Sequence, residues 1–152
     1  MTIAAPNLAI LRPVLKKIYM TYRFSLLIVG IFGISGVGLG AFGAHLLRDE
    51  LALRSMQSTW ETAVSYQLIH TVALLALVLF QNLNRASASS FLTWTARLWT
   101  AGILLFSGSL YVLAMGGPKI FGPITPMGGI ALLAGWGCII LEALHSPKKP
   151  EA

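Results

Sequence analysis

Charged side chains are scarce in this sequence. Asp, Glu, Lys and Arg together make up 11% of its 152 residues, whereas soluble domains carry roughly 25%. Hydrophobic residues make up 56%. So few charges exclude an ordinary soluble domain, because the chain lacks the polar surface that water requires.

Cysteines and catalytic motifs are scarce too. The single cysteine, Cys138, excludes an internal disulfide. There is no CxxCH haem-attachment motif, no structural zinc spacing, and no GxSxG, P-loop, HExxH or dinucleotide fingerprint. The sequence therefore predicts no enzyme, no metal site and no cofactor. The net charge of +6 is spread along the chain outside its apolar stretches, so we expect no nucleic-acid partner.

Four long apolar stretches dominate the chain. A bilayer core needs about 20 apolar residues per helix, and backbone groups in lipid must be satisfied within helices or closed barrels. The stretches lack the period-two alternation of barrel strands. They predict an all-α, polytopic membrane protein, with four transmembrane helices in a compact bundle at about 24–47, 63–83, 91–115 and 127–144.

The segments outside these spans carry most of the charge. Residues 1–23 place apolar and basic residues on adjacent arcs of a helix, which predicts an amphipathic helix on the cytoplasmic leaflet; a disordered basic tail is the alternative. Residues 49–60 predict a short interfacial helix, and residues 145–152 a short basic tail. The apolar face of the interfacial helix has three members at helical spacing: Leu53, Met56 and Trp60.

The distribution of Lys and Arg predicts orientation. Cytoplasmic loops carry the excess of these residues. The segments on the side of the two termini hold eight of them, and the opposite side holds three, Arg48, Arg54 and Lys119. We therefore expect a multi-pass protein of the bacterial inner membrane with both termini cytoplasmic.

Small residues mark the expected helix contacts. Gly36, Gly40 and Ala44 lie four apart on one face of the first span, a spacing that lets helix backbones approach closely. Gly108 in the third span and Gly135 in the fourth are the expected partners in one tight bundle. A glycine hinge, or a close approach to a ligand, is the alternative.

Polar residues form a candidate cluster near the outer ends of the first two spans. Tyr66, Gln67 and His70 share one face of the second span, with His45 and Glu61 nearby. Polar side chains at membrane depth usually point inward. The cluster is either an interhelical hydrogen-bond network, a pocket for a ligand, proton or ion, or a place where the histidines hold haem or a metal.

Two charged residues lie just inside the cytoplasmic ends of the last two spans. Arg97 and Glu142 are expected to pair there, or Arg97 extends to the interface. Trp94 and Trp99 beside them are typical of an interfacial aromatic belt.

Ordered motifs carry a family resemblance. They are Gly40-Ala-Phe-Gly-Ala-His45, Trp60-Glu-Thr-Ala with Tyr66-Gln-x-x-His70, Ala101-Gly with Phe106-Ser-Gly-Ser-x-Tyr111, and Ile124-Thr-Pro-x-Gly-Gly129 with Gly135-Trp136. Over about residues 24–144 the chain resembles the small bacterial inner-membrane proteins catalogued as domain of unknown function 423. The resemblance implies a four-helix membrane protein with the polar cluster around the outer mouth of its first two helices, and it implies no activity.

Three functions remain open from the sequence. The expected partners are the lipid bilayer and either other membrane-protein subunits or a second copy of the chain. The first function is a non-enzymatic accessory or assembly subunit of a larger membrane complex. The second is a small transporter or channel with a pocket near His45, Gln67 and His70. The third is a haem-binding electron carrier.

The orientation is directly testable. Reporter fusions at Ala152 and near Lys119 should report a cytoplasmic C-terminus and a periplasmic last connection, because of the charge asymmetry. A periplasmic signal from the fusion at Ala152 would contradict the orientation.

Overall fold

The computed structural model describes residues 8–83 and 89–145, and for residues 8–21 only the helical backbone. The described chain forms α1 (Leu8–Ala44), α2 (Arg48–Leu53), α3 (Gln57–Leu83), α4 (Ser90–Ala114) and α5 (Phe121–His145). Four segments are long and apolar enough to cross a membrane: Tyr22–Ala44 of α1, and all of α3, α4 and α5. The predicted all-α fold with four membrane spans is confirmed.

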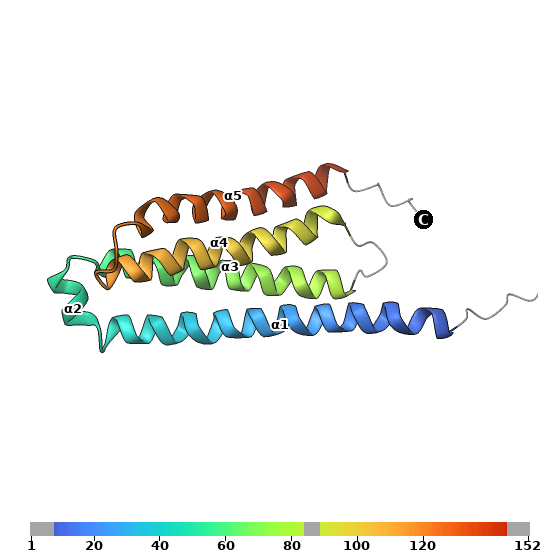
Figure 1. Cartoon of the computed structure of the whole chain (residues 1–152), viewed down its shortest axis with the longest axis horizontal. Helices are drawn as coiled ribbons and strands as arrows, with labels where there is room; N and C mark the ends of the chain where they lie inside the picture. The colour runs from blue at the N-terminus through green and yellow to red at the C-terminus, as the bar shows by residue number, and fades with distance from the viewer. Residues whose placement is uncertain (1–7, 84–88, 146–152) are drawn as a thin grey trace, which may run out of the picture.

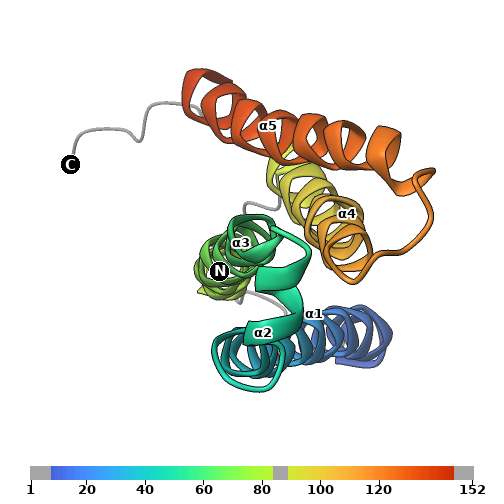
Figure 2. The same ribbon diagram turned by 90° about the vertical axis from the view of Figure 1, so that its left-hand side faces the viewer.

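The spans pack in the order α1, α3, α4, α5. The most extensive interface joins α4 to α5, and α3 packs on both α4 and α1. In the side view and the end view, α1 and α5 lie on opposite sides of the α3/α4 pair (Figure 1, Figure 2). Helices α1 and α5 are therefore the two edge helices.

The short helix α2 covers one end of the bundle, which we call the α2 end (Figure 1).

Two apolar clusters hold this order. The larger cluster draws on all four spans, with members such as Phe32 of α1, Leu77 of α3 and Leu132 of α5. The smaller cluster joins Leu51 of α2 to Trp60 of α3, and includes Ala114 of α4. Leu51 is 1% exposed, and Leu47 and Met56 on either side of α2 pack against the same cluster, so these side chains hold α2 on the end of the spans.

The N-terminal segment differs from expectation. Helix α1 continues from Leu8 to Ala44 without a break, rather than forming a surface helix followed by a span. No glycine or proline near residue 23 ends the helix. The side chains of residues 1–21 and the tail 146–152 lie outside the described ones, so binding of this segment to the membrane surface stays a prediction.

The predicted interfacial helix is shorter than expected. Ser55 has a φ of 55°, and Met56 N donates to Leu51 O across the turn at 2.9 Å, a left-handed closure that ends a helix. Helix α3 then begins at Gln57 and contains Trp60. The prediction that Leu53, Met56 and Trp60 share one face is therefore wrong.

Helix α5 also begins earlier than expected. It starts at Phe121 rather than near residue 127, so Pro126 lies inside it. Pro123 occupies the first turn, where a backbone N–H has no partner within the helix and proline is tolerated.

Glycines sit at the closest helix contacts. A Cβ at Gly36 would lie 2.7 Å from Leu68 Cδ2, and one at Gly40 would lie 3.3 Å from Val64 Cγ1, so both face α3. A Cβ at Gly135 would collide with the Trp99 ring. Gly108 has nothing within 4 Å, and its predicted packing role is wrong because the face of α4 toward α5 carries other residues. These are Trp99, Gly102, Phe106 and Ser109.

The tightest approach of a glycine to the backbone of another helix occurs at Gly128, where a Cβ would collide with the backbone nitrogen of Phe106. We expect Gly128→Ala to lower the free energy of unfolding by about 1–3 kcal/mol, because backbone atoms of α4 must move. Gly137→Ala on the same helix is the matched control, since nothing lies within 4 Å of that position. Equal unfolding curves for the two variants in detergent would contradict this account of the α4–α5 contact.

Candidate functional site

Gln67 is the polar residue that joins three helices. Its side chain is 4% exposed. Nε2 donates to Phe32 O and to Ser35 Oγ of α1, both at 2.8 Å. Tyr111 Oη of α4 donates to Gln67 Oε1 at 3.0 Å. Both amide hydrogens and the carbonyl oxygen therefore have partners on neighbouring helices.

His70 makes a second connection, from α3 to α5. It is 5% exposed. Nδ1 lies 2.9 Å from Tyr66 O, and Trp136 Nε1 of α5 donates to His70 Nε2 at 3.2 Å. A carbonyl only accepts and an indole N–H only donates, so a neutral ring with its hydrogen on Nδ1 satisfies both bonds.

Aromatic rings surround His70. The Tyr66 ring stacks on the His70 ring, with 5.9 Å between the ring centroids, and its centroid lies 4.6 Å from that of Phe106. The Trp99 and His70 rings meet edge to face, with 6.1 Å between their centroids, and the Trp99 centroid lies 4.7 Å from that of Trp136. Tyr66 is 43% exposed and Trp136 44%, so the cluster reaches the outer surface between α3 and α5. Trp99 is 2% exposed, and its predicted place in an interfacial belt is wrong.

The structure divides the predicted polar cluster. Gln67 and His70 lie in the core, Tyr66 lies at its margin, and Glu61 is exposed nearer the α2 end. His45 lies in the turn after α1, also exposed. His70 follows Gln57 by thirteen residues, which places it about 20 Å along the helix at 1.5 Å per residue. It is deeper than the sequence indicates, because α3 begins before residue 63. Within residues 22–83 and 89–145, no three of His, Cys, Asp and Glu gather as metal ligands do.

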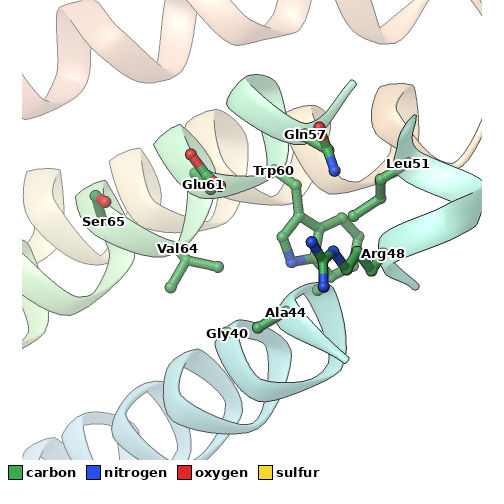
Figure 3. A pocket seen from close by; sticks show the side chains of 10 residues that line it. Gly40, Ala44, Arg48, Leu51, Gln57, Trp60, Glu61, Val64 and Ser65 are labelled. Atoms are coloured by element: carbon green, nitrogen blue, oxygen red, sulfur yellow. The ribbon is translucent and has the colours of Figure 1, made fainter. Parts of the chain in front are cut away.

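Glu61 instead lines a groove at the α2 end, between α1, α2 and α3 (Figure 3). The groove has a volume of about 470 Å³. Trp60 is 4% exposed and ties α3 to α1, since its Nε1 donates to Leu39 O at 2.9 Å. The lining residues are Gly40, Gly43, Ala44, Arg48, Leu51, Gln57, Trp60, Glu61, Val64 and Ser65. Gly40 and Ala44, whose spacing predicts helix packing, also form one wall here.

The predicted pair at the opposite end of the bundle does not form. Arg97 lies over the ring of Trp94, 5.3 Å from its centroid. Glu142 accepts a hydrogen bond from Ser89, the N-cap residue of α4. The two charged side chains lie on neighbouring helices, and each has a different partner.

Sequence reasoning missed several partners of the polar core. Ser35 lies one helical turn after the buried Phe32 of α1 and directly before Gly36. Tyr111 is the last residue of the third motif that carries the family resemblance. Between α4 and α5, Ser109 and Thr125 hydroxyls bond at 2.7 Å. A search for hydroxyl groups directly beside a glycine in the sequence would have found Ser35 and Ser109.

Comparison with known proteins gives the relatives of the chain. A family model described as "Protein of unknown function (DUF423)" matches residues 39–129. The "UPF0382 inner membrane protein YgdD" of Escherichia coli K12 is 36% identical over 131 residues, which cover 86% of this chain and 96% of the relative. A "UPF0382 membrane protein" of Staphylococcus epidermidis is 42% identical over 108 residues, covering 71% and 84%. No solved structure matches significantly.

The Gln67–Tyr111 bond is measurable by a double-mutant cycle. We expect Gln67→Leu and Tyr111→Phe to show a coupling energy of about 0.6 kcal/mol, and at most about 1.7 kcal/mol, in detergent or bicelles, as other membrane hydrogen bonds do. Gln67→Leu with Trp136→Phe is the control, because Trp136 bonds His70 rather than Gln67. That pair should be additive within about 0.3–0.5 kcal/mol. Equal coupling in the two cycles would contradict a direct bond.

Proposed function

We propose that this chain, which belongs to the DUF423 family of proteins of unknown function, is a non-enzymatic accessory or assembly subunit of a larger membrane complex. The observation that carries the proposal is the low burial of its edge helices. In the apolar stretches of α1 and α5, 17% of the residues are buried inside the chain, against 39% in the apolar stretch of α3. Two long apolar helices are thus available to pack against another membrane protein.

The outward faces of the edge helices suit such packing. On α1, Leu27, Ile31 and Ile34 are 63%, 63% and 80% exposed. On α5, Ile130 and Leu133 are 66% and 72% exposed. Helix association in lipid depends on van der Waals fit rather than on a hydrophobic force. Regular rows of branched side chains provide the ridges and grooves for this fit.

The geometry gives less support to transport. The buried amide of Gln67 bonds to α1 and α4, and His70 bonds to α5 and to its own helix. A transported polar species would have to displace these bonds. Haem ligation by His70 would likewise require one of its two ring nitrogens to lose its hydrogen-bond partner. His45, the second histidine considered for haem ligation, is exposed in the turn at the α2 end.

Site-specific photo-crosslinking in native membranes tests the proposal. A photoreactive residue at Ile34 of α1 or at Leu133 of α5 should give one discrete adduct with another membrane protein. Val72 of α3, which is 67% exposed, is the matched control on an inner helix and should not give that adduct. Lipid adducts alone at all three positions, or adducts only with a second copy of the chain, would contradict an accessory role.

A further inference from the structure

The groove at the α2 end holds two side chains of opposite charge. Arg48 begins α2 and Glu61 lies in the second turn of α3. We propose that this groove binds the headgroup of a zwitterionic phospholipid of the phosphoethanolamine class. Its phosphate lies against Arg48 and its ammonium group against Glu61.

The depth of the groove suits a headgroup. Its lining includes Ala44, the last residue of the Tyr22–Ala44 span. That span has 23 residues, which extend about 35 Å, somewhat more than the hydrocarbon core of about 30 Å. The end of the span therefore lies at the level where lipid headgroups meet water.

The charges of the groove are available to a ligand. Within the described chain neither Arg48 nor Glu61 has an ion-pair partner, whereas the adjacent Arg54 and Glu50 pair with each other at 2.6 Å. A guanidinium group binds phosphate oxygens in a bidentate manner, and a carboxylate accepts hydrogen bonds from an ammonium group. An anionic phospholipid would satisfy Arg48 alone and would bring a negative charge close to Glu61.

Small residues of α1 form one wall of the groove. Gly40 and Ala44 lie across from Val64 and Trp60 of α3 (Figure 3), and Gly43 contacts Trp60 so closely that a Cβ there would collide with the ring. The volume of about 470 Å³ lies within the roughly 300–1,000 Å³ of small-molecule sites. It accommodates a headgroup, and the acyl chains extend from Gly40 and Val64 along the apolar surface of the spans.

Native mass spectrometry of the full chain tests this inference. The delipidated protein in detergent is offered phosphatidylethanolamine and phosphatidylglycerol with identical acyl chains. We expect the wild type to retain phosphatidylethanolamine about fivefold better, the ratio that corresponds to about 1 kcal/mol. Glu61→Gln should remove the preference, and Arg48→Gln should reduce the retention of both lipids. Arg48→Lys should keep most of the binding, because the positive charge remains.

The paired residues at the same end supply the controls. Glu50→Gln and Arg54→Gln should retain the wild-type preference, since both lie outside the lining of the groove. Thermal unfolding of each variant checks that the fold persists. Soluble phosphoethanolamine at the same concentration should not compete, and competition would assign the groove to a free phosphate compound instead. Equal retention of the two lipids by the wild type, or groove variants that match the controls, would overturn the proposal.

Discussion

The hydrogen-bonding requirement of the buried Gln67 amide is the constraint on which the rest of the structure depends. An amide without partners in an apolar environment costs several kcal/mol, and lipid offers none. Its donors reach Phe32 O and Ser35 of α1, and its acceptor takes the hydroxyl of Tyr111 on α4. These bonds require α3 to lie between α1 and α4. His70 adds α5 through Trp136.

Glycines make those bonds reachable. A side-chain amide can reach a backbone carbonyl of a neighbouring helix only where the backbones come close, and Gly36 lies beside Leu68 and the Gln67 amide. The same relation holds between α4 and α5, where Gly128 and Gly135 accompany the bond between Ser109 and Thr125 and the bond that Thr95 donates to Gly135 O. Close packing and polar bonding therefore stabilise the same interfaces. The outward faces of the two edge helices, α1 and α5, have neither.

The sequence predicts the fold class, the four spans and the burial of Gln67 and His70, because span length and helical periodicity are local properties. It does not predict the rotation of each helix about its own axis, which depends on the neighbouring helix. Gly108 is therefore assigned to the wrong face, and Arg97 and Glu142 receive different partners. Nor does it predict that Ser55 ends α2, because a positive φ at a serine is uncommon. From that turn follows the early start of α3, which places His70 deep in the membrane and Glu61 at its margin.

Depth then separates the two kinds of polar residue that share α3. In the middle of the span water cannot reach a side chain, so Gln67 and His70 have partners within the chain, and their bonds fix the helix order. At the end of the span headgroups and water are present, so Glu61 of α3 and Arg48 of the neighbouring α2 are exposed there without pairing to each other. A residue six positions before Gln67 thus differs in role because its environment differs. The helix whose buried face holds the bundle together at its centre is free to bind the surroundings at its end through another face, on which Glu61 is exposed.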